Sequence, residues 1–227
     1  MKLYHYDSSG KLFEGKKIEL QQCPDEYNQL CNLFPNGMSE FGLRVLKPFT
    51  HPVFGNRHIF SFLGIPTPIN MIEFEYLSIP LDGTAMGLQE YNLELVRRAF
   101  SLSKPSRLDS LFALSSPDDL INWRHTGLLK AEGRLFEINT TKSVKLDARH
   151  IGKVIRFDWT EAVTMSRDGE NEKFCDVGFS ANELLDNTLN YWNGIPTDNP
   201  MWEHLVKLPV EIGCEVSIPH NTQRILD

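Results

Sequence analysis

Two strand-like runs follow one another in the stretch Trp202-Glu203-His204-Leu205-Val206-Lys207-Leu208-Pro209-Val210-Glu211-Ile212. The run at 203–207 is centred on the apolar pair Leu205 and Val206, whereas the run at 210–218 alternates apolar and polar residues as a half-buried strand does. Before them, the capping-box spacing at 180–183 predicts the start of a helix, and the Asn-, Gly- and Pro-rich segment 193–200 ends it. This part of the chain is therefore expected to form a helix, a loop and two strands.

Further strands are predicted at 3–6, 110–114, 133–138 and 155–159. The strands outnumber the helices and do not alternate with them regularly, which favours an α+β fold over a doubly wound sheet. A length of 227 residues, with 41% hydrophobic side chains, is enough to bury one substantial core. We expect a single domain over residues 1–227.

An amphipathic helix is predicted over 88–100, because apolar side chains recur there at helical spacing. Its expected buried stripe consists of Leu88, Tyr91, Leu95, Val96 and Ala99. Arg97 and Arg98 stand at its C-terminal end, where cations suit the helix dipole. In contrast, residues 34–71 are rich in Gly, Pro and aromatic side chains, and we predict a loop-rich elaboration there.

The charge is unevenly distributed along the sequence. The formal net charge is −7, but residues 97–156 carry 12 basic and 6 acidic side chains between two acidic flanks. This basic region favours local binding of a phosphate-rich ligand over general coating of nucleic acid. Five of its basic residues are expected either to face phosphates or to form an ordinary solvated face: Lys142, Lys145, Arg149, Lys153 and Arg156.

The sequence lacks the motifs that are typical of several classes of protein. The four cysteines show no C-x-x-C spacing, so neither a zinc site nor a disulfide framework is indicated, and no metal is expected. No apolar window is long enough to span a membrane, and the first residues reach Asp7 too early for a secretory signal. We therefore expect a cytoplasmic protein without membrane contact. The motifs of P-loop, Rossmann, zinc-protease and serine-hydrolase proteins are absent.

Three residues attract attention as candidates for chemistry. His5 lies on the first predicted strand, Trp123 ends a short helix that Ser116 caps, and Glu203 opens a strand after a loop. A carboxylate in the position of Glu203 is suited to stabilising a developing positive charge. Each residue also has an ordinary explanation, as a strand histidine, a core aromatic and a solvated strand-end glutamate.

The order of these residues resembles the ADP-ribosyltransferase superfamily, in the His–aromatic–Glu branch shared by diphtheria-type toxins and poly-ADP-ribose polymerases. The middle unit stands as Leu111-Phe112-Ala113-Leu114-Ser115-Ser116 and continues to Trp123. The late segment Trp202-Glu203-His204-Leu205-Val206 looks like the Glu-x-Leu-Val strand of bacterial toxins that ADP-ribosylate nucleic acid. The resemblance implies a split central β-sheet flanked by helices, with NAD as the substrate.

The resemblance also implies roles for individual residues. Glu203 would hold the ribose 2′-hydroxyl and stabilise the oxocarbenium-like state formed when the nicotinamide bond breaks. His5 would bind the adenosine-side ribose, and Trp123 would stack on nicotinamide together with Phe112. The other residues expected at the cofactor are Ser115 and Arg107, the latter at the pyrophosphate or at an acceptor phosphate.

The loop before Glu203 corresponds in order to the acceptor-contacting segment of the family. Its candidate residues are Thr197, Asp198, Asn199 and Trp202; an ordinary surface turn is the alternative. Met201 replaces the Glu or Gln that arginine-modifying members carry two residues before the catalytic glutamate. An RNA or DNA acceptor is therefore favoured over a protein side chain, in a toxin, effector or phage-defence component with a possible neutralising antitoxin.

Two other functions stay open at this point. An RNA 2′-phosphotransferase of related fold would also consume NAD, but it would depend on Arg107 and on Arg97 and Arg98 rather than on Glu203. A catalytically inactive binding module that keeps the fold would turn over no NAD at all.

Overall fold

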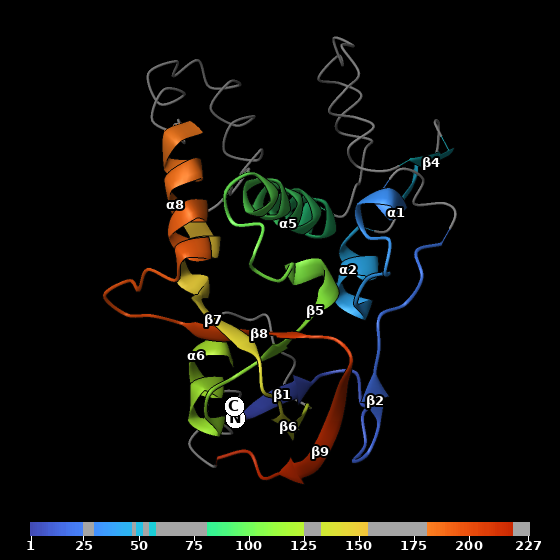
Figure 1. Cartoon of the computed structure of the whole chain (residues 1–227), viewed down its shortest axis with the longest axis vertical. Helices are drawn as coiled ribbons and strands as arrows, with labels where there is room; N and C mark the ends of the chain where they lie inside the picture. The colour runs from blue at the N-terminus through green and yellow to red at the C-terminus, as the bar shows by residue number, and fades with distance from the viewer. Residues whose placement is uncertain are drawn as a thin grey trace, which may run out of the picture.

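The structure is a computed structural model that describes residues 1–24, 30–46, 49–51, 55–57, 81–124, 133–153 and 181–219. In chain order its elements are β1 (Lys2–Asp7), β2 (Lys17–Ile18), α1 (Leu30–Leu33), α2 (Glu40–Val45), β3 (Phe49–His51), β4 (Gly55–Arg57), α5 (Leu81–Phe100), the 3-10 helix η2 (Arg107–Asp109), β5 (Ser110–Ala113), the 3-10 helix η3 (Pro117–Asp119), α6 (Leu120–Arg124), β6 (Arg134–Asn139), β7 (Ser143–Asp147), the 3-10 helix η4 (Ala148–Lys153), α8 (Ala181–Asn193), β8 (Trp202–Lys207) and β9 (Val210–Val216). Its helices and antiparallel sheets confirm the α+β class (Figure 1).

Two antiparallel sheets form the centre of the described structure. One has the strand order β1-β6-β9-β2, and the other has the order β5-β8-β7. Strands β3 and β4 pair only with each other. The two larger sheets meet where β1 passes β5, at a single bridge between Tyr4 and Leu114. Two backbone hydrogen bonds cross this seam, at 3.0 Å from the Tyr4 amide and 2.7 Å from the Leu114 amide.

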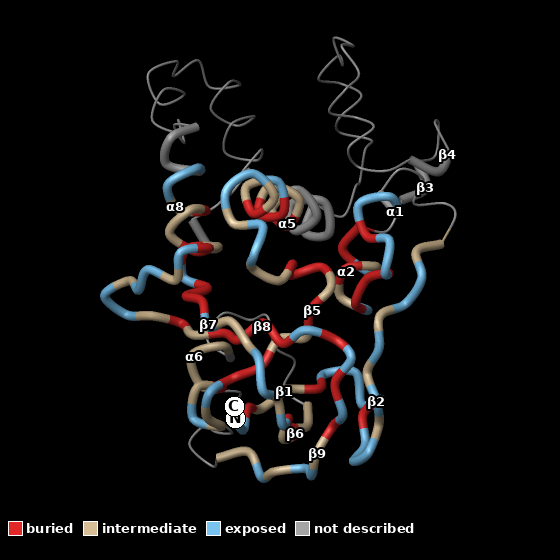
Figure 2. Tube along the Cα trace, viewed as in Figure 1, coloured by how far each residue is buried: buried red, intermediate tan, exposed pale blue. Residues whose placement is uncertain are grey.

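Each face of the three-stranded sheet is covered by a different apolar cluster. One face shares a core with the four-stranded sheet, through Leu3, Leu12, Ala113, Phe136, Ile138, Val206, Leu208, Val210 and Ile212. The other face packs on helices α5 and α8 through Leu93, Leu146, Tyr191, Trp192 and Leu205. Figure 2 shows buried chain along β8, which lies between these two layers. Strand β8 is therefore enclosed on both faces.

Helix α5 covers the predicted residues 88–100 but begins earlier, at Leu81, and the predicted buried stripe is only partly right. Tyr91 and Val96 are half-buried, whereas Leu95 and Ala99 are exposed. The buried positions of the helix include Leu93 together with Glu90, Glu94 and Arg97. The reason is that the inward face of α5 carries ion pairs as well as apolar contacts. A pattern based on hydrophobicity assigns such charged positions to solvent.

Other local expectations have mixed outcomes. The cap of the short helix is confirmed, because the Ser116 and Asp119 side chains form a reciprocal capping box. Residues 40–45, predicted to be irregular, form α2 instead, with Ser39 as its N-cap. Strand β7 was not predicted, although Ser143-Val144-Lys145-Leu146-Asp147 alternates as strands do. The strand expected at 155–159 lies outside the described residues.

Helix α2 packs its backbone directly against the segment that carries Arg107. The Leu108 carbonyl accepts hydrogen bonds from the Ser39 amide at 2.9 Å and from the Ser39 hydroxyl at 3.0 Å. A Cβ atom on Gly42 would overlap the same Leu108 carbonyl oxygen. Only glycine permits this close approach, which sets the position of η2.

We therefore predict that Gly42→Ala destabilises the protein by about 1–3 kcal/mol, through overpacking against η2. Alanine normally stabilises a helix relative to glycine by about 1 kcal/mol, so the sign is reversed here. Urea unfolding measures the change, with Arg44→Ala at an exposed position of the same helix as the control. A Gly42→Ala variant as stable as the control would show that the close packing is not required.

Candidate active site

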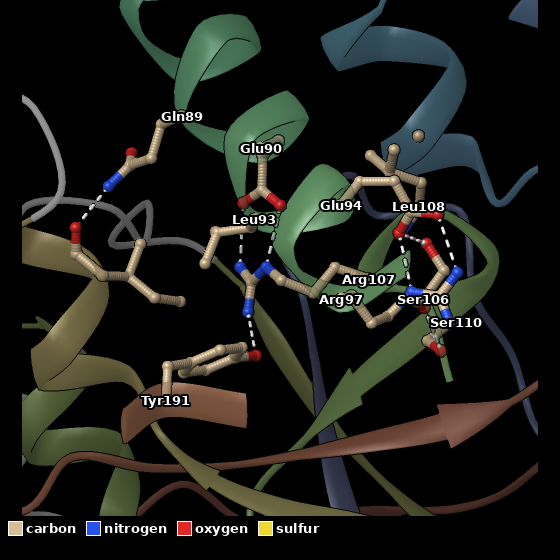
Figure 3. A network of polar contacts seen from close by, with 12 residues as sticks. Gln89, Glu90, Leu93, Glu94, Arg97, Ser106, Arg107, Leu108, Ser110 and Tyr191 are labelled. Carbon is tan, nitrogen blue, oxygen red and sulfur yellow. Dashed lines mark hydrogen bonds and ion pairs between the residues drawn. The ribbon is translucent and has the colours of Figure 1, made fainter. Parts of the chain in front are cut away.

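Arg107 lies at the centre of a buried polar cluster. Ser106 caps η2, with its hydroxyl accepting from the Leu108 amide and donating to Glu94 at 2.7 Å. From this short helix the guanidinium extends toward Glu90 of α5 and Tyr191 of α8 (Figure 3). Its Nε and Nη2 atoms donate to the two carboxylate oxygens of Glu90 at 2.8 and 2.9 Å, a bidentate pair.

The remaining edge of the guanidinium contacts Glu203, the second residue of β8. Arg107 Nη1 donates to Glu203 Oε1 and also to the Tyr191 hydroxyl, at 2.7 Å from the latter. Tyr191 in turn donates to the same Glu203 oxygen at 2.6 Å. Glu203 is only 2% exposed. One buried cation is thus shared by two buried carboxylates, with a tyrosine hydroxyl between them.

The electrostatics of this cluster are dominated by burial and by the imbalance of charge. Burial raises the pKa of Glu203, the Arg107 cation and the Tyr191 hydroxyl lower it, and Glu90 raises it again; the result lies above the ordinary value. Burial also raises the pKa of Tyr191, which therefore stays a hydrogen-bond donor. Although burial disfavours the Arg107 cation, Glu203 and Glu90 more than offset this and raise its pKa. The glutamate is held by a permanent cation.

His5 joins this cluster from across the seam. Its Nδ1 atom lies 2.7 Å from the backbone carbonyl of Phe112. A carbonyl only accepts, so Nδ1 carries the proton and Nε2 is the acceptor of the ring. Burial lowers the pKa of His5, which keeps the ring neutral at pH 7. The Phe112 ring lies 4.7 Å from the Arg107 guanidinium, so four of the predicted residues, His5, Phe112, Arg107 and Glu203, form one connected group.

The other two predicted cofactor residues, Ser115 and Trp123, contact the residues on either side of Glu203 in β8. Ser115 is hydrogen-bonded to His204 Nε2 at 2.9 Å, and the other ring nitrogen of His204 bonds Ser143 at 3.0 Å. Because neighbours on a strand point to opposite faces, His204 faces away from Glu203. The Trp123 indole N–H donates to the Trp202 carbonyl at 3.2 Å, which places Trp123 beside the start of β8.

The predicted acceptor loop is anchored by a residue that the sequence did not single out. The fully buried Asp147 accepts from the Thr197 amide and hydroxyl at 2.7 and 2.8 Å, and from the Met201 amide at 2.8 Å. Thr197 therefore anchors the loop to Asp147. Asp198 and Asn199 are exposed, and the Asn199 carbonyl accepts from Arg149.

Part of the predicted basic region is directed inward. Arg97 and Arg107 are buried in ion pairs with Glu94 and Glu90. Of the five basic residues expected to form a stripe, Lys142, Lys145 and Arg149 are exposed, and the side chains of Lys153 and Arg156 lie outside the described residues. The Lys145 ammonium lies 4.3 Å from the Trp202 ring centre, a cation–π contact beside the loop.

The model of a protein family described as "Protein of unknown function (DUF2441)" matches residues 3–218. The chain belongs to this family. The match runs from before His5 to beyond Glu203, so the whole candidate site lies within it. No protein with a curated description matches the chain. Within the described residues, no helix is long and apolar enough to cross a membrane, and no group of three or more His, Cys, Asp or Glu side chains is placed to hold a metal ion.

Asp147 gives the loop of this family member a pH dependence. Burial disfavours its charge, but amide donors from Thr197, Arg149 and Met201 outweigh this and lower its pKa below the ordinary value. A carboxyl with a lowered folded-state pKa contributes stability above its unfolded pKa of about 3.9, and loses it as the pH falls through the folded value. We predict that Asp147→Asn costs about 1–3 kcal/mol at pH 7.

Thermal unfolding of wild type and Asp147→Asn from pH 7 to pH 2 measures this contribution. The difference in stability should shrink as the pH falls below about 4, where the carboxyl of the unfolded chain takes up a proton, and it should be smallest below the lowered folded-state pKa, where both states are protonated. Asp198→Asn, at an exposed carboxylate of the same loop, serves as the control and should change little. A difference that is constant over the whole range would contradict the assigned role of the Asp147 charge.

Proposed function

We propose that the chain is an NAD-dependent mono-ADP-ribosyltransferase of α+β fold with a split central sheet. The observation that carries the proposal is that three motifs, far apart in the sequence, lie on neighbouring strands. His5 is on β1, Phe112 on β5 and Glu203 on β8; β5 meets β1 at the seam and pairs with β8 on its other side. The division of the sheet at this seam supports the ADP-ribosyltransferase-like fold that the sequence resemblance implies.

The chemistry proposed for Glu203 is stabilisation of a positive charge. Breaking the bond between nicotinamide and ribose generates an oxocarbenium-like centre, and a carboxylate that holds the 2′-hydroxyl stabilises it. Both described hydrogen bonds to Glu203 end on Oε1. Among the described residues, Oε2 accepts none, so this oxygen is the one proposed to bind the ribose. Burial strengthens such an interaction because it excludes water, whose high dielectric constant weakens the attraction between charges.

His5 is proposed to bind the adenosine-side ribose. Its ring is neutral, and its orientation is fixed by the bond from Nδ1 to the Phe112 carbonyl, which leaves Nε2 as an acceptor for a hydroxyl donor. Trp123 and Phe112 are the proposed aromatic neighbours of nicotinamide, and Ser115 is a further proposed contact of the cofactor. Arg107 then acts through Glu203, which it already contacts, rather than on the pyrophosphate.

The acceptor is proposed to be RNA or DNA, bound by the loop 194–201 and Trp202. Exposed Lys145 and Arg149 flank this loop, and they supply positive charge for phosphates. Met201 lacks the carboxylate or amide typical of arginine-directed members. The proposed role is that of a cytoplasmic toxin, effector or phage-defence component, which a protein antitoxin neutralises.

The phosphotransferase alternative gains no support from the arginine positions. Arg107 and Arg97 are both buried against glutamates rather than directed toward an open phosphate site. The experiment that follows separates the transferase from the two alternative functions. An inactive binding module releases no nicotinamide, and a phosphotransferase does not require Glu203.

We predict that Glu203→Gln lowers nicotinamide release and ADP-ribose transfer by about 100- to 1,000-fold, because it removes the charge that stabilises the oxocarbenium-like state. Wild type and variant are incubated with NAD labelled in its adenosine part, together with RNA, DNA or cell lysate in separate reactions. Glu211→Gln, at an exposed position of β9, is the matched control. Wild-type protein that labels no acceptor and releases no nicotinamide would refute the transferase.

A further inference from the structure

Glu90 has no place in the sequence resemblance, yet it holds the arginine that contacts Glu203. Its side chain is 3% exposed, and both of its oxygens accept from Arg107, at 2.8 Å from Nε and 2.9 Å from Nη2. A bidentate pair of this kind fixes the plane of the guanidinium as well as its position. The direction in which Nη1 points is thus set by Glu90 (Figure 3).

A second glutamate of the same helix provides an internal comparison. Glu94 lies one turn further along α5, is equally buried, and forms a bidentate pair with Arg97, at 2.8 Å for each bond. Its oxygens also accept from Arg98 Nε at 2.6 Å and from the Ser106 hydroxyl at 2.7 Å. The free edge of Arg97 is used differently, since Nη1 donates to the Lys104 carbonyl at 2.8 Å. Helix α5 therefore supplies the glutamates of two bidentate Glu–Arg pairs; the Nη1 atom of one arginine donates to the backbone and that of the other donates to Glu203.

We propose that Glu90 is a positioning residue for the reaction: it orients Arg107 so that Nη1 holds Oε1 of Glu203 and leaves Oε2 directed to the ribose of NAD. The negative charge of Glu90 has a second effect. It competes with the Glu203 carboxylate for the single positive charge of Arg107. This inference rests on the proposed transferase function. It assigns no contact between Glu90 and the substrate.

The groups that face Glu203 determine the expected pH dependence. They are the Arg107 cation from η2, the Tyr191 hydroxyl from α8 and the Glu90 carboxylate from α5, while the residue opposite on β7 is the apolar Leu146. Glu90→Gln keeps the shape and one acceptor oxygen but removes the competing negative charge. The Arg107 cation then acts on Glu203 alone, so the pKa of Glu203 falls.

The test compares Glu90→Gln with Glu94→Gln in the rate of nicotinamide release from pH 4 to pH 9. We expect Glu90→Gln to lower kcat about tenfold, the usual effect of losing one charged hydrogen bond, with KM for NAD within about twofold of wild type. In a plot of the kcat of Glu90→Gln against pH, the acidic limb should move to lower pH. Glu94→Gln should leave both kcat and the limb unchanged when the two variants are compared at temperatures equally far below their melting points.

An acidic limb that stays in place in Glu90→Gln, or equal effects of the two variants on kcat, would overturn the inference, because both glutamates would then contribute stability alone. A measurement without NAD keeps this test separate from that of the transferase. Carbon-13 NMR of labelled glutamate carboxyls gives the titration midpoint of Glu203, assigned by its loss in Glu203→Gln. If wild type turns over no NAD, a lower midpoint in Glu90→Gln supports the coupling, and an unchanged midpoint refutes it.

Discussion

The charge of Arg107, buried among two carboxylates and a tyrosine, is the interaction on which the arrangement of the described elements depends. It joins α5, α8 and β8 through residues that are 7% exposed or less. Removing one partner of a buried ion pair costs about 3–5 kcal/mol, because the other charge is left uncompensated. The apolar cluster of Leu93, Tyr191, Trp192 and Leu205 surrounds the same contacts, so packing and charge reinforce each other here.

The parts of the fold that follow local rules were predictable from the sequence. The strands at β1, β5, β6, β8 and β9 and the capping box at Ser116 rest on alternation, apolar runs and side-chain caps, which neighbouring residues determine. Strand β7 carries the same alternating signal, but its lysine, Lys145, was interpreted as part of a basic stripe. The inward face of α5 was not predictable in this way, since Glu90 is buried only because Arg107 lies opposite it.

The residues of the candidate site were likewise predictable only in part. The sequence pointed to Glu203, Arg107, Phe112 and His5. In the structure Arg107 contacts Glu203 and the Phe112 ring, and His5 bonds the Phe112 backbone carbonyl. The sequence did not point to Glu90 or Tyr191, whose partners are at least 17 and 12 residues away, or to Asp147, whose partners in the loop are 50 and 54 residues away. No spacing rule connects such positions. A pair of glutamates four residues apart, followed by Arg97 and Arg98, was the available hint of paired buried charges on α5.

The seam between β1 and β5 has a mechanical consequence. Between the described residues of these two strands, three hydrogen bonds cross it: the two of the Tyr4–Leu114 bridge and the one from His5 to the Phe112 carbonyl. By contrast, β1 is paired with β6 along all six of its residues. The seam is thus held by fewer hydrogen bonds than the β1–β6 pairing, and the apolar core shared by the two sheets adds to the contact between them. His5 supplies the one side chain among these three bonds, so loss of its imidazole would leave only the two backbone bonds of the Tyr4–Leu114 bridge.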